Sequence, residues 1–456
     1  MQAIASAISA FFEFKAYVML PVIVLFLGLA ARMRAKDAFL SSLKLASGFA
    51  GIFVAFNFFV SKIGPAVKSF TAARGLDYPV LDVGWPPLAA ITWSWSLAPL
   101  CILIVVALNL AMLALKATDM VYIDVWNYWH FAFIGTLLLA TGASLPLALV
   151  AVLAIAVFTI KTAEWSVPYV QRECGLEAIG ISPLSVAGLL PYAVAVDRLL
   201  DLVPGVRRIG VNPSRAGSGG NSILAEPMAI GLVVGVLLGI AAGYSVKDVL
   251  ELGVDVAAVM FILPACGKVL GEGMGAVSAA LRDAVQKRFP GRTLSIAMDT
   301  GVIMTNPSVI ANGLVLMPLS VALAFVLPGN KMIPLGDLPN LISIFSLLTL
   351  AFGGNVFRSV LASLPVVAGF MLIAGDLAPL ITRLAAQTGM DFGAGGADFN
   401  AFTDGGNPVR YWILKLSAGD WIAIAIIPVV AFLLWFNWKE SRRVEAGLRG
   451  GIPAQR

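Results

Sequence analysis

Charged side chains are scarce in this sequence. Of its 456 residues, 31 are Lys or Arg and 26 are Asp or Glu, so 12 % are charged, whereas a soluble domain carries roughly 25 %. Apolar residues make up 59 % of the chain, and the mean hydropathy is +0.91. A soluble fold of this composition would expose large apolar patches. The composition therefore excludes a soluble enzyme and indicates a membrane protein.

Other absences exclude further functions. The net charge is only +5, and the basic residues form short clusters instead of a stripe, so we expect no nucleic-acid partner. Three separated cysteines, Cys101, Cys174 and Cys266, predict no disulfide framework, metal site or bound cofactor. The chain has no loop histidine to carry a phosphoryl group and no GxxxxGK[ST] motif, which excludes ATP-driven transport by this chain. Residues 1–10 do not resemble a signal peptide, so we expect the first apolar segment to be retained.

Long runs without charge are the main positive signal. A helix needs about 20 mostly apolar residues to cross roughly 30 Å of hydrocarbon. We therefore predict an all-α polytopic membrane protein with about 11 transmembrane helices. The runs are 16–31, 45–61, 83–115, 125–160, 178–196, 227–246, 300–330, 338–357, 359–375 and 421–438, with a more polar candidate at 249–270.

Two of these runs contain residues that interrupt a helix. The run 83–115 opens with Gly84-Trp85-Pro86-Pro87, and the run 300–330 contains Asn306-Pro307 and Pro318. Irregular backbone at membrane depth needs protein or a water-filled cavity to satisfy its hydrogen bonds. We therefore predict re-entrant or discontinuous helices here, and both runs are candidate sites.

Four basic clusters predict the orientation of the chain. They lie at 32–36, 198–215, 282–292 and 439–456. Because cytoplasmic loops are enriched in Lys and Arg, the first loop and the tail are predicted to be cytoplasmic and the N-terminus outside. An odd number of crossings follows, which favours eleven over ten.

The sequence also contains a weak internal repeat. Lys36-Asp37 recurs as Lys247-Asp248, and four further matches follow in the same order at offsets between 211 and 219 residues. The basic loops fall on opposite sides in the two copies, which is typical of inverted-repeat transporters. We expect a first membrane repeat at 15–203, a second at 222–385, a connecting loop and last transmembrane helix at 386–438, and a basic cytoplasmic tail at 439–456.

Four aspartates at matched positions are the sharpest candidates for a site. Asp82 matches Asp299, and Asp124 matches Asp337. An Asp beside an apolar span is costly unless it is paired or faces water. One interpretation is that these carboxylates bind substrate hydroxyls, with Asp299 as a candidate general base. The other is that they cap helix N-termini.

Aromatic and hydroxyl residues add further candidates. Trp85 and Trp93, with Thr92, flank the Pro-broken segment, and an indole face suits the C–H bonds of a sugar. His130, the only histidine, is either a hydrogen-bond donor to substrate or a satisfied core residue. Membrane-interface Trp residues are common without any ligand. The polar positions Ser182, Thr305 and Asn306 either surround a ligand or satisfy backbone freed by nearby Pro and Gly.

Several ordered motifs resemble the galactitol-type enzyme IIC, the membrane permease of the bacterial phosphoenolpyruvate-dependent phosphotransferase system. The resemblance covers roughly residues 15–438. The motifs are Leu81–Pro86 (LDVGWP), Asp124–His130 (DVWNYWH), Val203–Arg207 (VPGVR), Ala225–Pro227 (AEP), Ala242–Asp248 (AGYSVKD), Val326–Asn330 (VLPGN) and Pro334–Asp337 (PLGD).

The resemblance implies group translocation across the bacterial inner membrane. Such a permease binds a polyol or sugar and presents it to a separate soluble EIIB, whose phosphocysteine phosphorylates it and is recharged by EIIA. It also implies a lipid-embedded homodimer, and it places the Asp82–Trp85 segment, Ser182, Asp299 and the Thr305–Asn306 stretch at the substrate pocket. Ser182-Pro183 stands where relatives carry a histidine, so the substrate is a galactitol-like polyol or another sugar.

An alternative function keeps the same fold. In it the chain is an ion-coupled or passive secondary transporter of a small polar solute, with Asp299 or Asp82 as proton carrier. A membrane-embedded transferase would need a reactive triad or a metal cluster, which one His and no Cys pair do not supply. The chain itself is expected to be the membrane subunit of a phosphotransferase complex, without a phosphoryl-carrying residue of its own.

Overall fold

Helices make up most of the chain. The fold is described from a computed structural model that covers residues 16–74, 78–95, 98–207, 209–216, 227–289, 291–304, 306–387 and 397–449. The mostly helical, membrane-type architecture predicted from the sequence is confirmed.

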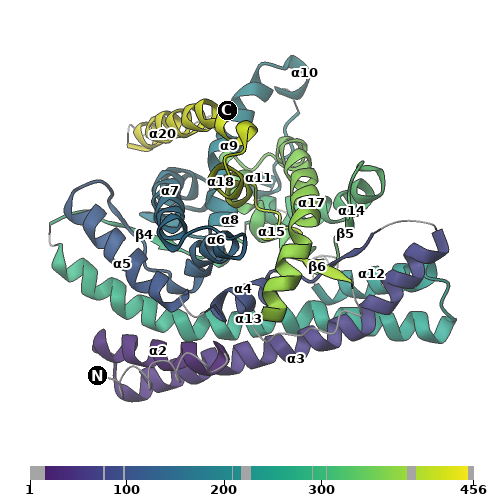
Figure 1. The fold of residues 1–456 in the computed structure, drawn as a ribbon. Coiled ribbons are helices and arrows are strands. Elements are labelled where there is room, and N and C mark those ends of the chain that lie inside the picture. Colours follow the sequence, from purple (N-terminus) through teal and green to yellow (C-terminus); the bar gives the residue numbers. More distant parts are fainter. Residues whose placement is uncertain are drawn as a thin grey trace.

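Two helix pairs form a layer along one edge of the molecule. Figure 1 shows α3 and α13 lying side by side there, with most of the other elements above them. Each long helix follows a shorter apolar one, so the layer consists of two helical hairpins. The bounds are α2 Ala16–Ala30, α3 Ala35–Arg74, α12 Pro227–Ala241 and α13 Val246–Arg288.

Glycines let α12 and α13 approach closely. Gly231, Gly235 and Gly239 are spaced four residues apart and therefore lie on one face of α12. An added Cβ would lie 2.7 Å from the Cα of Ala257 at Gly231, and 2.7 Å from the carbonyl oxygen of Leu252 at Gly235. Small residues at this spacing are typical of close helix packing in membranes.

The remaining helices form a bundle that lies above the layer of α2, α3, α12 and α13 in Figure 1. Their lengths vary from single turns to α17, which has 32 residues. The bounds are α4 Trp85–Trp93, α5 Ala98–Ala114, η1 Val125–Tyr128, α6 Trp129–Ala140, α7 Leu145–Cys174, α8 Leu184–Ala187, α9 Leu190–Asp201, α10 Pro204–Arg207, α11 Pro213–Ala216, η3 Thr300–Val302, α14 Pro307–Val326, α15 Leu341–Ile344, α16 Ser346–Ala351, α17 Val356–Gln387, α18 Pro408–Ser417, α19 Trp421–Ala425 and α20 Ile427–Arg449.

Six short strands were not predicted and correct the all-α expectation. They form two parallel sheets with the orders β5-β1-β6 and β2-β4-β3. Each strand has only two to four residues, too few for an alternating pattern to be visible in the sequence. The bounds are β1 Val80–Asp82, β2 Met120–Val121, β3 Ile179–Ile181, β4 Ser295–Met298, β5 Met332–Ile333 and β6 Asp398–Asn400.

The two sheets interlock the two halves of the chain. In each sheet the central strand comes from one half and both neighbours come from the other. Val80 of β1 pairs with Met332 and with Asp398, whereas Ile296 of β4 pairs with Val121 and with Ile179. Neither half can therefore complete a sheet alone.

Three helices in the described chain are long and apolar enough to cross a membrane: α7, α14 and α17. Helices α4 and α5 pass the same test only together, and the bend of 92° between them is that of a broken span or a re-entrant loop. These criteria concern length and composition only, so eleven crossings stay a prediction.

The structure divides several apolar runs that looked continuous in sequence. In 83–115, the Gly84–Pro87 motif that predicted a break lies at the start of α4, and a second break separates α4 from α5. In 300–330, the predicted break at Asn306-Pro307 lies at the start of α14, whereas Pro318 lies inside α14 without ending it. The run 125–160 belongs to η1, α6 and α7, and 338–357 includes the short helices α15 and α16. Runs of apolar residues overestimate helix continuity here because buried loops in a membrane protein are themselves apolar.

The close approach of α12 and α13 predicts that a Gly→Ala substitution between these helices destabilises the protein more than the same substitution elsewhere. Gly235→Ala should lower the free energy of unfolding by about 1–3 kcal/mol, since its Cβ would overlap the backbone of α13. Gly369→Ala in α17 is the control, because its Cβ meets no atom within 4 Å, and it should be neutral or stabilising by roughly 1 kcal/mol. Thermal unfolding of the purified protein in detergent measures both. Equal melting temperatures would contradict the proposed packing.

Candidate functional site

A cavity of about 820 Å³ lies between the strand ends and α13. Parallel strands bring the residues that follow them to one edge of their sheet, where ligands commonly bind. The segments that follow all six strands contribute to the lining. Their lining residues include Trp85 after β1, Asp124 after β2, Ser185 after β3, Asp299 after β4, Asp337 after β5 and Asp404 after β6.

The opposite wall of the cavity belongs to α13. Lys268, Glu272 and Arg282 line it there. Glu272 is held by Lys44 of α3, with 3.1 Å between Nζ and Oε2. The cavity therefore has a wall of strand ends rich in carboxylates and a helical wall that carries both signs of charge.

An amide bridges two carboxylates on the strand-end wall. Nδ2 of Asn127 donates to Oδ2 of Asp124 at 2.8 Å and to Oδ2 of Asp299 at 3.0 Å. The Ser182 hydroxyl donates to the same oxygen of Asp124 at 2.6 Å. Asp124 and Asp299, which follow β2 and β4 of one sheet, are thereby held together beside the cavity.

Both of these aspartates retain unused acceptor positions. A carboxylate can accept about four hydrogen bonds. In the part of the chain that the structure describes, Oδ1 of Asp124 accepts none. Oδ1 of Asp299 accepts the N–H of Gly301 and the hydroxyl of Thr300, both at 3.2 Å. Asp299 therefore both caps the short helix η3 and lines the cavity, whereas Asp124 makes no capping bond.

Asp82 has no acceptor position to spare. Its Oδ1 accepts the N–H groups of Gly84 and Phe402 at 3.2 and 3.0 Å. Its Oδ2 accepts those of Leu335 and Asp337 at 2.8 and 3.1 Å. The side chain is fully buried and does not line the cavity. These contacts favour the structural interpretation of Asp82 over the substrate-binding one.

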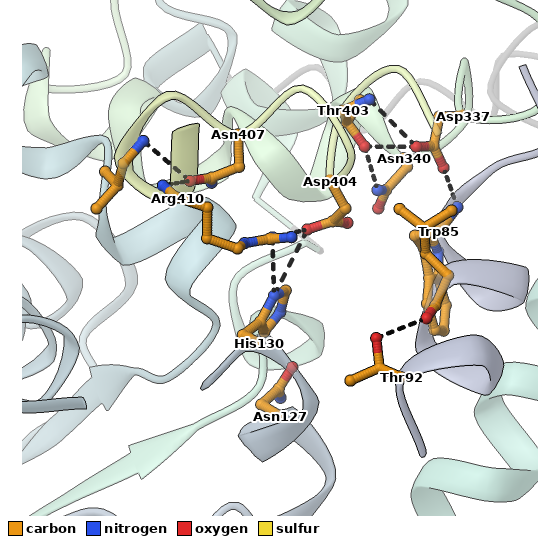
Figure 2. A network of polar contacts seen from close by, with 12 residues as sticks. Trp85, Thr92, Asn127, His130, Asp337, Asn340, Thr403, Asp404, Asn407 and Arg410 are labelled. Carbon is orange, nitrogen blue, oxygen red and sulfur yellow. Dashed lines mark hydrogen bonds and ion pairs between the residues drawn. The ribbon is translucent and has the colours of Figure 1, made fainter. Parts of the chain in front are cut away.

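Asp337 occupies an intermediate position. Its Oδ1 accepts the N–H of Trp85 at 2.9 Å, and its Oδ2 accepts the Thr403 hydroxyl at 2.6 Å (Figure 2). Gly84 packs against this carboxylate with a φ of 75°, and a Cβ there would lie 3.0 Å from the carbonyl oxygen of Gly336. Asp337 therefore lines the cavity and also holds the non-helical backbone before α4 in place.

His130 belongs to a buried cluster beside the cavity. Figure 2 shows His130 converging with Asp404 and Arg410, with Asn127 nearby. Nη2 of Arg410 lies 3.2 Å from Oδ1 of Asp404 and 3.3 Å from Nδ1 of His130. Asp404 and His130 line the cavity. Neither Asp404 nor Arg410 was predicted from the sequence.

The aromatic candidates separate into two groups. Trp85 lines the cavity and meets Trp126 edge to face, with 6.0 Å between ring centroids. Trp93 and Thr92 are completely buried, and neither lines the cavity. The Thr92 hydroxyl donates to the carbonyl oxygen of Leu88 within α4, at 2.8 Å. These contacts make Trp93 and Thr92 core residues.

The remaining predicted polar residues lie behind the cavity or away from it. Ser182 supports Asp124 without lining the cavity. Asn306 caps α14, where its Oδ1 accepts the N–H groups of Ser308 and Val309 at 2.9 and 3.3 Å. Thr305 lies outside the described residues. The structure thus brings Trp85, Asp124, His130, Asp299 and Asp337 together around one cavity.

Comparison with known proteins identifies similar chains along almost the whole length. A family model described as the sugar-specific permease component of the PTS system, EIIC-GAT, matches residues 10–396. The galactitol-specific EIIC component of the PTS system from Escherichia coli K12 is 32 % identical over 432 residues, which cover 93 % of this chain and 94 % of that protein. A putative permease IIC component from the same strain is 29 % identical over 421 residues, covering 91 % and 96 %.

The different environments of Asp82 and Asp299 predict different effects of the same substitution. Asp82→Asn leaves two buried N–H groups without an acceptor, at roughly 1–3 kcal/mol each, so it should strongly lower the melting temperature. Asp299→Asn, at the matched position, should change it little. Thermal unfolding in detergent compares them. A stable Asp82→Asn protein would contradict the structural role of Asp82.

Proposed function

The chain belongs to the EIIC-GAT family of sugar-specific permease components of the phosphotransferase system, and from this premise we propose that it binds and translocates a galactitol-like polyol or a sugar. The relative at 32 % identity is galactitol-specific. The observation that carries the proposal is the cavity of about 820 Å³, which Asp124 and Asp299 line with unused carboxylate acceptors.

The chemistry of the cavity suits a neutral polyhydroxylated ligand. Hydroxyl groups donate well to carboxylates, and such charge-assisted hydrogen bonds are stronger than neutral ones. Trp85 and Trp126 add indole faces against which the C–H groups of a polyol can pack. The same carboxylates would repel an anionic sugar, which favours uncharged substrates.

In this family, a separate soluble protein phosphorylates the substrate that the permease presents. The soluble EIIB carries the phosphoryl group on a cysteine and is recharged by EIIA, and the substrate hydroxyl attacks that phosphorus. As the new O–P bond forms, the S–P bond breaks and leaves the EIIB thiolate. We propose Asp299, which lines the cavity, as the general base that takes the hydroxyl proton.

The finer architecture is also part of the proposal. The strand order of the two sheets supports two inverted repeats. The first repeat supplies the central strand β1 of one sheet and the outer strands β2 and β3 of the other, and the second repeat supplies the central strand β4 and the outer strand β5, while the outer strand β6 follows in the segment 386–438. The apolar runs and the charge distribution support eleven helices with the N-terminus outside and the C-terminus cytoplasmic, and membership of the family supports a multi-pass protein of the bacterial inner membrane. We also propose that the protein forms a homodimer in the lipid bilayer. Each chain is divided into a first repeat at 15–203, a second repeat at 222–385, a connecting loop with the last transmembrane helix at 386–438, and a cytoplasmic tail at 439–456.

Reconstitution tests the transport mechanism directly. Vesicles that contain the chain should accumulate galactitol only as its phosphate ester, and only when phosphoenolpyruvate and the soluble phosphotransferase components with matching EIIA and EIIB are supplied. Omission of EIIB is the control and should abolish accumulation. Uptake of unmodified galactitol without these partners, abolished by an uncoupler, would instead establish the ion-coupled alternative.

A substitution tests the substrate-binding role of Asp299. Asp299→Asn should weaken galactitol binding about 10- to 100-fold, because it replaces a charged acceptor by a neutral amide. Asp283→Asn, on an exposed position of α13 that does not line the cavity, is the control and should leave binding unchanged. Titration calorimetry of the purified proteins measures both. Unchanged affinity of the Asp299→Asn protein would remove Asp299 from the site.

A further inference from the structure

The cluster around His130 contains a buried cation with few hydrogen bonds. Arg410 is 2 % exposed and lies in the first turn of α18. Its backbone N–H is held by the side chain of Asn407, which caps the helix at 3.1 Å. The guanidinium carbon lies 4.8 Å from the ring centroid of Phe133 and 5.6 Å from that of Trp129. Arg410 is thereby fixed in place by a helix cap and two aromatic rings.

One nitrogen of Arg410 makes all its side-chain hydrogen bonds to the described residues. Nε and Nη1 are buried and have no partner there. Nη2 contacts Oδ1 of Asp404 at 3.2 Å and Nδ1 of His130 at 3.3 Å, so its two hydrogens serve two acceptors. A buried cation with unpaired donors is costly. Nη2, with its contacts to Asp404 and His130, is therefore the nitrogen through which Arg410 acts on its surroundings.

This contact determines where the His130 proton lies. A guanidinium can only donate hydrogen bonds, so Nδ1 of His130 must accept. A neutral imidazole whose Nδ1 accepts carries its proton on Nε2. A doubly protonated ring would direct a second N–H at Arg410 and bring two cations together. The carboxylate of Asp404 lies 3.6 Å from Nδ1, beyond a normal hydrogen bond, and it balances the charge of Arg410.

We propose that Arg410 and Asp404 are positioning residues that hold His130 neutral, with its proton on Nε2, so that His130 donates a hydrogen bond to a substrate hydroxyl. The proposal rests on the proposed function, since it takes the cavity beside His130 as the polyol site. A hydroxyl both donates and accepts. Asp124 and Asp299 supply acceptors, and the Nε2–H of His130 supplies the complementary donor.

The arrangement also assigns a role to the aromatic neighbour. The ring of Trp129 stacks on His130 with 4.1 Å between centroids, and the same indole lies beneath the Arg410 guanidinium. This stacking restricts rotation of the imidazole. The stacking therefore supports His130 as a donor of fixed orientation.

The single histidine makes the protonation state directly measurable. Full-length protein, purified with a tag that lacks histidine and labelled with ¹⁵N-histidine, gives signals from one imidazole only. We expect a protonated Nε2 and an unprotonated Nδ1. A protonated Nδ1, or a doubly protonated ring, at neutral pH would overturn the proposal.

A double variant tests the role of the positioning pair. Asp404→Leu combined with Arg410→Met removes both charges and the donor to Nδ1 without adding a new donor, so the signal of the Nδ1-protonated tautomer should appear. Asp283→Asn is the matched control and should keep the wild-type spectrum. An unchanged tautomer in a folded double variant would overturn the proposal. If the double variant does not fold, the wild-type spectrum still decides it.

Two substitutions of His130 test the donor itself. The amide nitrogen of Gln can occupy the place of Nε2, whereas the shorter side chain of Asn reaches only the place of Nδ1. His130→Gln should therefore retain galactitol binding to within a few-fold, and His130→Asn should weaken it about tenfold. Equal loss in both would overturn the donor role. An Nε2-protonated ring with no galactitol binding in wild type would instead count against the proposed polyol function alone.

Discussion

The ends of the three strands β1, β5 and β6 beside the cavity depend on hydrogen bonds to one buried carboxylate, Asp82. Irregular backbone inside a membrane protein must be satisfied internally, because lipid offers no partners. Asp82 accepts N–H groups from three segments that are far apart in sequence, at Gly84, at Leu335 and Asp337, and at Phe402. The break before α4, the turn after β5 and the turn after β6 are thereby held together. A carboxylate suits this position since it accepts four bonds and donates none.

The matched aspartates illustrate how similar sequences acquire different roles. Asp82 is the last residue of the central strand β1, and Asp299 is the first residue after the central strand β4. Four backbone groups saturate Asp82, whereas Asp299 receives two local donors and the amide of Asn127 and still faces the cavity. The difference is made by the neighbouring loops. The loops around Asp82 direct their N–H groups at its carboxylate, whereas the loops around Asp299 leave its carboxylate in contact with the cavity.

The class of fold could be predicted from properties of the whole chain, whereas the site depends on contacts between distant segments. Missing charge and long apolar runs are properties of the whole chain, so they indicated a membrane protein reliably. Trp93 and Asp82 look like site residues in sequence because an indole or a carboxylate in an apolar context is unusual, yet both are buried. Arg410 escaped prediction because its partner His130 lies 280 residues away and because it falls in a segment expected to be a connecting loop. Long-range pairing of this kind leaves no local pattern.

Residues 127–130 connect the proposed hydrogen-bond donor His130 with the carboxylate acceptors Asp124 and Asp299. Asn127, in η1, bridges Asp124 and Asp299, and His130 follows three residues later in the first turn of α6. Residues three apart on a helix face the same side. A rotation of this stretch would therefore displace the carboxylate bridge and the imidazole together. Because η1 continues directly into α6, helical geometry sets the spacing between the Asn127 amide and the imidazole, whereas the segment after β4 supplies Asp299 and the Asn127 hydrogen bond ties it to this stretch.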